Sequence, residues 1–364
     1  MTQSLLIRSE PINTQIKGAH AWKVWYLTND VNDISHESTG IIVAPTVEAI
    51  NRPILSWAHG TTGLGDAACP SEQPDSAREL ITYFDLEATE QIDFGVPGLQ
   101  SMIDAGYVVV ATAYQGLGTK GMHQYMVNRT NARDAVFIAR AATEIPELNV
   151  GTKLTCVGWS QGGGSAAAVA ELDPADFGDL KLLGCVLLSP GALVPVLAHP
   201  TGIEGAISNA NLVPDSHLLM TLTAHAHAFD KLNMTDVFTP VGSELMNKIW
   251  NTQPGHHIGD TAKRTFNLRG ALLRSDPQNK AEWELAFAKG SAGMQKPNCP
   301  LLVCIDGYKG GTVITVDQQQ AYIDAVTKLG AQVEVKQYPD DDHFSLPKNA
   351  VPHFLTWVSE RYKD

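Results

Sequence analysis

The sequence lacks the features that are typical of nucleic-acid-binding proteins, membrane proteins and proteins held together by disulfides. It carries 26 Lys and Arg residues against 39 Asp and Glu residues, a formal net charge of -13, and no dense basic cluster. Basic clusters neutralise phosphates, so neither nucleic acid nor an anionic membrane surface is an expected partner. No apolar run approaches the length of a membrane span, so stable membrane insertion is not expected either.

Cysteine is scarce and scattered. The five cysteines are odd in number, and three of them (Cys156, Cys185 and Cys304) lie in apolar, strand-like runs that predict core positions. Cys69 and Cys299 lie in loop-like sequence, and their spacing does not define a pair. The first ten residues show no charged segment followed by an apolar run, so the sequence as written predicts a cytoplasmic protein, or a secreted one if an export signal has been removed.

The rest of the composition is that of a globular protein. Hydrophobic residues make up 44% of the 364 positions and charged residues 18%. Strands are predicted at 21–27, 38–44, 53–58, 106–114, 154–157, 182–189, 300–305 and 332–338, and helices at 96–105, 128–145, 318–329 and 351–361. Strand and helix in alternation predict an α/β fold with a mostly parallel central sheet and helices on both faces, preceded by an antiparallel lead-in.

The segment from Gly158 to Gly162 reads Gly-Trp-Ser-Gln-Gly and follows an apolar strand, while an Ala-rich helical segment comes after it. A serine on a sharp turn between strand and helix projects its hydroxyl from the sheet edge, and flanking glycines remove Cβ atoms that would clash. The pattern also occurs in ordinary Gly-rich turns, but the strand and the helix supply the context that a nucleophile requires. Ser160 is therefore the predicted nucleophile.

Negative charge on an oxygen in acyl transfer must be stabilised by N–H donors. The strand 53–58 ends in His59-Gly60-Thr61-Thr62-Gly63, where small residues leave backbone N–H groups unshielded. Taken alone this is as well explained by an ordinary Gly-rich turn, but together with Ser160 it predicts an oxyanion loop. The expected donors are the N–H groups of Thr61 and of Gln161, the residue after the nucleophile.

From 191 to 295 the alternation stops. Helical stretches at 218–232, 240–250 and 281–290 follow one another without a convincing strand. We expect residues 1–190 and 296–364 to form the core domain and 191–295 a helical cap, or lid, inserted into it. The apolar residues of this insertion predict a pocket for an apolar group, although a module that only stabilises the core would look similar.

The segment 66–93, between the predicted strand at 53–58 and the predicted helix at 96–105, is polar and is expected to be a long surface excursion.

Histidines stand at two kinds of position. His225, His227, His256 and His257 form His-x-His and His-His pairs, but no acidic or cysteine partner stands at ligand spacing, so no metal site is expected. His343 follows the last predicted strand. A surface histidine beside acidic residues would look the same, but the chain order of serine, acid and histidine predicts that His343 is the general base.

Several of these motifs together resemble the secretory lipase (lipase A type) family of α/β-hydrolases. They are Trp57-Ala58-His59-Gly60-Thr61-Thr62-Gly63, then Cys69-Pro70-Ser71, Tyr114-Gln115-Gly116-Leu117-Gly118-Thr119 and the turn at Ser160. The resemblance covers nearly the whole chain and implies an α/β-hydrolase fold with a helical cap. It further implies a serine esterase or lipase that cleaves carboxylic esters through Ser160 and His343. The family is mostly exported.

The position of the catalytic carboxylate departs from the pattern of this family. In such folds a carboxylate usually precedes a short apolar run after the strand at 300–305, and here Gly311 occupies that position. Asp306 at the end of the strand is the nearest substitute, although a strand-end Asp that caps backbone N–H groups is nearly as good an interpretation. Asp317, Asp340 and Asp342 are weaker candidates. The predicted triad is therefore Ser160, His343 and Asp306.

The sequence thus predicts a serine hydrolase that acts on a small ester with an apolar acyl or alcohol group and that needs no cofactor. An amidase or acyltransferase would use the same serine and histidine. The missing carboxylate leaves open a weakened hydrolase fold that only binds an apolar ligand. Oligomeric state, chain-length preference and interfacial activation do not follow from the sequence.

Overall fold

The protein is described by a computed structural model covering residues 4–307 and 313–363. Its strands are β1 (Leu6–Ile12), β2 (Ala19–Asn29), β3 (Ser35–Pro45), β4 (Arg52–Ala58), β5 (Val108–Thr112), β6 (Val150–Trp159), β7 (Lys181–Leu188), β8 (Leu301–Asp306) and β9 (Val333–Tyr338). They form one nine-stranded sheet in the order β1-β2-β3-β5-β4-β6-β7-β8-β9. β1, β2, β3 and β5 pair antiparallel, and β5, β4, β6, β7, β8 and β9 pair parallel. The predicted mostly parallel sheet with an antiparallel lead-in is confirmed.

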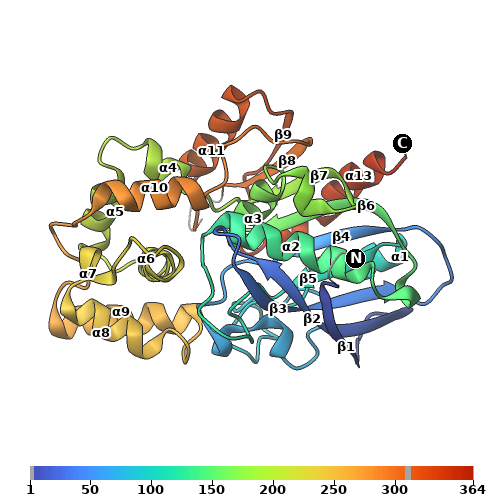
Figure 1. The fold of residues 1–364 in the computed structure, drawn as a ribbon, viewed down its shortest axis with the longest axis horizontal. Helices are drawn as coiled ribbons and strands as arrows, with labels where there is room; N and C mark the ends of the chain where they lie inside the picture. Colours follow the sequence, from blue (N-terminus) through green and yellow to red (C-terminus); the bar gives the residue numbers. More distant parts are fainter. Residues whose placement is uncertain (1–3, 308–312, 364) are drawn as a thin grey trace.

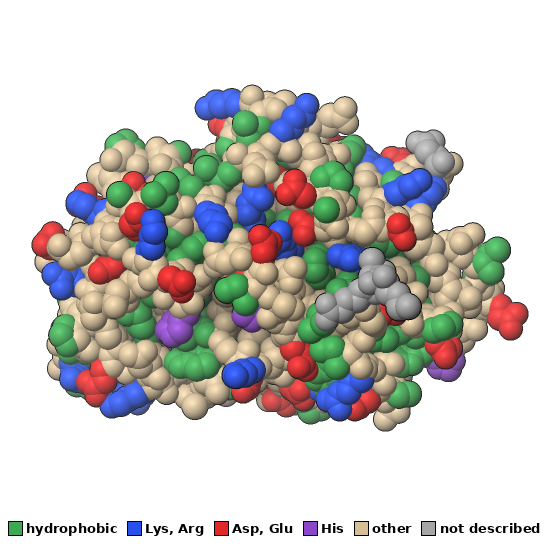
Figure 2. Space-filling view, viewed as in Figure 1, with side chains coloured by type: hydrophobic (Ala, Val, Ile, Leu, Met, Phe, Trp, Pro, Cys, Tyr) green, Lys and Arg blue, Asp and Glu red, His purple; other side chains and the backbone are tan. Residues whose placement is uncertain are grey.

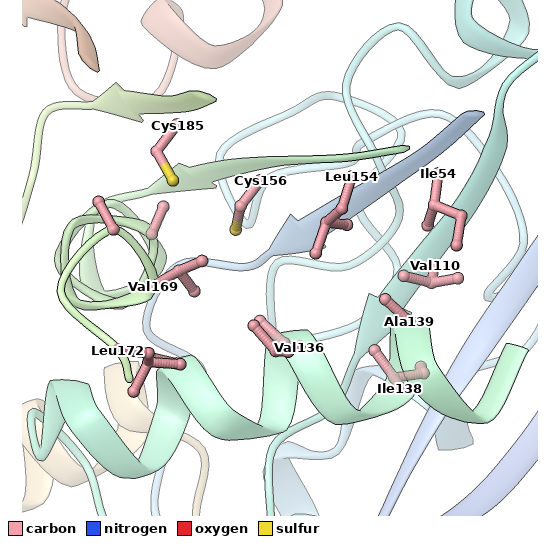
Figure 3. Packing of buried hydrophobic residues seen from close by; sticks show 14 of the residues in the cluster. Ile54, Val110, Val136, Ile138, Ala139, Leu154, Cys156, Val169, Leu172 and Cys185 are labelled. Atoms are coloured by element: carbon pink, nitrogen blue, oxygen red, sulfur yellow. The ribbon is translucent and has the colours of Figure 1, made fainter. Parts of the chain in front are cut away.

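Successive residues of the strands pack against helices on opposite faces of the sheet. Ile54 of β4 packs in a cluster with α2 (Asn128–Ala142), α3 (Gln161–Val169) and α11 (Val316–Lys328), whereas Leu55 packs with α1 (Leu99–Asp104) and α13 (Val351–Arg361). Figure 3 shows Ile54, Val110, Leu154 and Cys156 pointing from the sheet toward Val136, Val169 and Leu172. This period-two alternation gives the sheet two buried faces, as helices on both sides require.

The segment between β7 and β8 is helical, and its apolar side chains pack into a second cluster together with residues such as Leu64 and Tyr125 from loops outside it. It contains α4 (Val194–Ala198), α5 (Gly202–Ala210), α6 (Ser216–Ala228), α7 (Met234–Val237), α8 (Pro240–Ile249), α9 (Gly255–Arg269) and α10 (Lys280–Gly290). In Figure 1 these helices gather beside the sheet, far from both termini. Two backbone contacts join α9 to the loop after β4: the N–H of Gly255 donates to the carbonyl of Thr62 at 2.6 Å, and Gly63 and Pro254 form a β-bridge.

The expectation that 66–93 is a surface excursion is only partly right, because Phe84 and Leu86 are exposed whereas other residues of the segment are buried. The segment begins with the 3₁₀ turns Asp66–Ala68 and Pro70–Glu72, and Ala68, Cys69 and Ala77 are completely buried. Ile81 and Ile92 pack with Ala113 and Tyr114 behind the ends of β4 and β5. Its apolar residues are few and follow no helix or strand period, because the backbone between them is irregular. Two more 3₁₀ turns, Pro146–Leu148 and Pro174–Phe177, and the short helix α12 (Leu346–Asn349) complete the chain.

All five cysteines are free and buried, including Cys69 and Cys299, which the sequence places in loops. Within residues 4–307 and 313–363, no helix is both long and apolar enough to cross a membrane.

The molecular face shown in Figure 2 carries Lys and Arg side chains interspersed with Asp and Glu side chains.

Candidate active site

Ser160 sits between β6 and α3 with φ 59° and ψ -119°, a backbone conformation that side-chain-bearing residues rarely adopt. Such a conformation costs about 1–3 kcal/mol and persists only where the surroundings impose it. Here the N–H of Ser160 donates to the carbonyl of Leu188 at 2.9 Å, and its carbonyl accepts the N–H groups of Gly164 at 3.1 Å and Gly191 at 2.8 Å. These bonds fix the turn that presents the hydroxyl.

The glycines around Ser160 are required by backbone crowding. A Cβ on Gly158 would lie 1.9 Å from the carbonyl oxygen of Gly162, and a Cβ on Gly162 would lie 1.9 Å from that of Ala58. The partner is backbone in both cases, so no side chain can move aside. The turn between strand and helix can therefore be built only with glycine at these two positions.

Gly162→Ala should therefore destabilise the fold by about 3 kcal/mol or more, because the new methyl group meets the carbonyl of Ala58. Urea unfolding followed by circular dichroism measures the loss. Gly259→Ala is the matched control, since the nearest atom to its Cβ is the Ser216 hydroxyl at 3.3 Å and the site lies within α9. Alanine there should leave stability unchanged or raise it by up to about 1 kcal/mol. Equal stability of the two variants would contradict the crowding argument.

His343 follows β9 and is 2% exposed. Its ring lies 5.4 Å from the ring of Trp159, the residue before Ser160, and its carbonyl accepts the indole N–H of Trp159 at 2.8 Å. His343 and Ser160 line the same cavity. Among the described residues no hydrogen bond joins the Ser160 hydroxyl to the His343 ring, and contacts between a nucleophile and its base are often long before a substrate binds.

Asp306, the last residue of β8, is the carboxylate that the structure brings to His343. It is fully buried, and its Oδ2 lies 3.5 Å from Nδ1 of His343. Of the weaker candidates, Asp317 and Asp340 are exposed, and Asp342 accepts the N–H groups of Phe344 at 3.0 Å and Ser345 at 2.7 Å. The position of Gly311 lies outside the described residues.

Two further side chains that the sequence analysis missed hold this pair. The Ser189 hydroxyl lies 3.1 Å from Nδ1 of His343, and the amide nitrogen of Gln319 donates to Oδ1 of Asp306 at 2.6 Å. The same amide nitrogen donates to the carbonyl of Ile314 at 2.9 Å, so two acceptors fix its orientation. Gln319 is a fully buried polar residue on α11, and its position within a periodic helix was the only available signal.

The electrostatics of His343 favour the neutral ring. Burial lowers the pKa of His343 below its usual 6.5, while the hydrogen bond and the charge of Asp306 act in the opposite direction. Desolvation disfavours the imidazolium because a charged ring loses its hydration. Near neutral pH the ring is therefore available as a proton acceptor.

Gln161 is held by a second layer that the sequence did not reveal. Its amide nitrogen donates to Oδ1 of Asn131 at 3.2 Å and to Nε2 of His123 at 2.7 Å. The other ring nitrogen of His123 contacts the carbonyl of Gln115 at 3.1 Å, and burial lowers the pKa of His123 to about 3, so the ring is neutral. Since Gln161 opens α3, its N–H belongs to the first helical turn, whose N–H groups have no partner within the helix.

Thr61 lines a cavity together with Ser160. Its hydroxyl bonds the Tyr125 hydroxyl at 2.9 Å, and the Tyr114 hydroxyl donates to the carbonyl of His59 at 2.9 Å. A Cβ on Gly60 would lie 2.8 Å from the ring of Trp159. The loop therefore runs close against the residue that precedes Ser160.

Two cavities meet at Ser160, and both are lined by His217 and Val313 as well. The larger, of about 440 Å³, extends under α4, α5 and α6 and is mostly apolar; its lining includes Leu193, Val196, Ile203, Ala206, Leu218 and Phe287. The smaller, of about 220 Å³, is lined by His343 and Thr61 together with Phe84, Asp93, Met220, His256 and Phe344. We call them the large chamber and the small chamber.

Three of the four histidines that form pairs in the sequence contact groups other than a metal site. Nδ1 of His225 lies 2.8 Å from the carbonyl of Thr221, Nδ1 of His227 lies 2.9 Å from that of Thr223, and His256 stacks on Tyr83. No three His, Cys, Asp or Glu side chains in the described part of the chain are grouped so as to hold a metal ion. A serine, a neutral histidine, a carboxylate and nearby N–H groups are the components of nucleophilic acyl transfer.

The profile of the Secretory lipase family matches residues 85–364. Solved structures with the same fold include the rice cell wall degrading esterase LipA from Xanthomonas oryzae, with 18% identity, a TM-score of 0.67, and coverage of 99% of this chain and 97% of that one. Candida antarctica lipase A in its closed state has 12% identity, a TM-score of 0.72, and coverage of 100% of this chain and 83% of that one. No curated protein is similar enough in sequence to be matched.

Proposed function

As a member of the secretory lipase family this chain is a carboxylic ester hydrolase with an α/β-hydrolase fold, and we propose that Ser160, His343 and Asp306 carry the reaction. The observation that carries the assignment is the buried pair of Asp306 and His343, which lies beside the strained turn of Ser160. Without that pair, the sequence left open a weakened fold that only binds its ligand.

The reaction has two steps. Nε2 of His343 takes the proton of Ser160 as the serine oxygen attacks the ester carbonyl, and the imidazolium then gives the proton to the departing alcohol oxygen. Asp306 stabilises the imidazolium and holds the ring with Nδ1 protonated. Water, activated by the same ring, attacks the acyl-enzyme and releases the acid. The N–H groups of Thr61 and Gln161 bind the oxyanion in both steps.

The proton path assigns the two halves of the substrate to the two chambers. Since His343 must reach the departing oxygen, the alcohol belongs in the small chamber, whose wall includes His343. The acyl group then extends into the large chamber, which is mostly apolar and continues under α5 and α6. We infer that the substrate is a small ester with an apolar acyl group, and that residues 191–295 act as a cap on the core formed by 1–190 and 296–364.

Activity should rise with acyl chain length until the large chamber is full. Each buried methylene contributes about 0.8 kcal/mol, so kcat/KM for nitrophenyl esters should increase roughly fourfold per carbon beyond acetate. Ala206→Phe, on α5 in the wall of the large chamber, should move the optimum to shorter chains and leave acetate hydrolysis intact. An unchanged chain-length profile in this variant would overturn the assignment of the acyl group.

Two additions to the ester panel distinguish an esterase from an amidase and an acyltransferase. An amidase would prefer the matching anilides, and an acyltransferase would form a new ester when an alcohol is added. Membership of a secretory family supports the secreted alternative for localisation.

A further inference from the structure

The small chamber contains a buried carboxyl group that the proposed reaction does not use. Asp93 is 4% exposed and lines the chamber together with Ser160 and His343. Its Oδ1 accepts the N–H of Tyr83 at 2.6 Å. Its other oxygen has no hydrogen-bond partner within the described residues, so half of this carboxyl group's bonding capacity is unused inside a cavity beside the nucleophile.

The surroundings disfavour the ionised form of Asp93. Burial raises the pKa of Asp93 to about 7, and the charge of Asp85 adds to the effect while Lys348 opposes it. Lys348 itself pairs with Asp85, so Asp93 has no cation of its own there. Phe84 and Phe344 line the same chamber and carry no donor, and none of the polar side chains that also line it makes a hydrogen bond to Asp93 within the described residues. The second oxygen of Asp93 is open to the chamber rather than fully buried, so a donor on a ligand can reach it and add the hydrogen bond that the described residues do not make.

We propose that Asp93 is a specificity-determining residue that accepts a hydrogen bond from a free hydroxyl group on the alcohol half of the ester. The preferred substrates are then partial esters of diols or polyols with an apolar acid. The inference rests on the proposed function, because the proton path is what puts the alcohol in the small chamber.

A hydroxyl group fits this carboxyl group better than a cation does. Near neutral pH a group with a pKa of about 7 is a mixture of neutral and ionised forms, and both forms can accept an O–H. A cation is favoured only by the ionised form and would lose its own hydration in the chamber. His256, on the same wall, has its pKa lowered to about 4 by burial, so it adds no charge that a cation or anion would meet at neutral pH.

The test compares three butyrates that differ only in the alcohol: 2-hydroxyethyl, 2-methoxyethyl and propyl. They are measured at pH 8, above the pKa of about 7, so that Asp93 is mostly ionised and can accept but not donate. The wild-type protein should prefer the hydroxyethyl ester to the propyl ester by about tenfold or more in kcat/KM, as for a hydrogen bond to a charged group. The methoxyethyl ester, which cannot donate, should gain nothing.

Two variants of Asp93 have different expected outcomes. In Asp93→Asn the amide oxygen can still accept the Tyr83 N–H, and its NH₂ then faces the chamber as a donor, so the methoxyethyl ester should gain on the hydroxyethyl ester. In Asp93→Leu both oxygens are gone, and the three esters should be cleaved within about twofold of one another. Met220→Leu, an apolar change in the same chamber, should keep the wild-type order.

A wild-type protein without hydroxyl preference would overturn the proposal, and so would a preference that survives in both Asp93 variants. If the leucine variant does not fold, the asparagine variant decides alone. Hydrolysis of nitrophenyl butyrate is followed in parallel. If it is lost in the wild type the proposed function fails, whereas normal turnover with unchanged alcohol preference rejects only the role of Asp93.

Discussion

Replacing Ser160 with alanine should lower kcat for nitrophenyl butyrate by about 10⁴- to 10⁶-fold while the protein stays folded. Alanine keeps a Cβ in the same backbone conformation, so the turn at φ 59° is no more strained than before. What is lost is the oxygen that forms the acyl-enzyme. The remaining activity would come from the oxyanion donors and from substrate binding alone.

Covalent labelling provides the second measurement. A serine-directed phosphonate should modify the wild type stoichiometrically and leave Ser160→Ala unmodified in the mass spectrum. Ser165→Ala is the control, because Ser165 lies in α3 one turn beyond the nucleophile, fully buried, and donates to the carbonyl of Gln161 at 3.0 Å. That variant should still be labelled. Turnover retained in Ser160→Ala would reject the mechanism.

Asp306→Asn should lower kcat by about 10³- to 10⁴-fold, and the hydrogen bonds of the site give the reason. Gln319 donates to Oδ1 of Asp306, so an asparagine in this position is expected to keep its oxygen toward Gln319. Its NH₂ then faces Nδ1 of His343 and selects the tautomer with the proton on Nε2, which cannot accept a proton from Ser160. The double variant with Gln319→Glu should recover part of the loss, because Glu can turn the asparagine oxygen toward Nδ1.

The pH dependence of activity tests the pair of Asp306 and His343 independently. The proposed reaction needs the neutral ring of His343, and burial lowers the pKa of that ring, so the acid limb of kcat/KM should lie below pH 6.5. Asp306 raises that pKa, so the residual activity of Asp306→Asn should show an acid limb at still lower pH. Asp317→Asn, an exposed change on the first turn of α11, should alter neither kcat nor the limb. An active enzyme with unchanged kcat in Asp306→Asn would mean that another acid serves His343.

The sheet and the turn at Ser160 could be predicted because their determinants are local. A buried strand shows itself as an apolar run, and the crowding at Gly158 and Gly162 needs glycine at fixed spacing. The edge strand β1 was missed because Arg8, Ser9 and Glu10 face solvent and carry no alternation. α9 was missed since only Gly255, Ile258 and Ala262 are buried in it.

The contacts that support the site could not be predicted because they join distant parts of the chain. Ser189 follows β7 and Gln319 lies on α11, yet both bond to the pair of Asp306 and His343. Asn131 looks like an ordinary polar residue of α2 until the fold puts it against Gln161. A single sequence gives no pattern for such pairs, whereas Asp306 could be named because strand ends of a parallel sheet gather at one edge.

The backbone link between Gly255 and Thr62 has a consequence for recombining this protein with its relatives. The helices from 191 to 295 look like an exchangeable part, but the loop that carries Thr61 is bonded to them through Thr62 and through the bridge of Gly63 with Pro254. A chimaera that imports foreign helices therefore also imports a new support for the proposed oxyanion donor. Chain-length preference and catalytic rate are expected to be inherited together, unless Pro254 and Gly255 are carried over with the core.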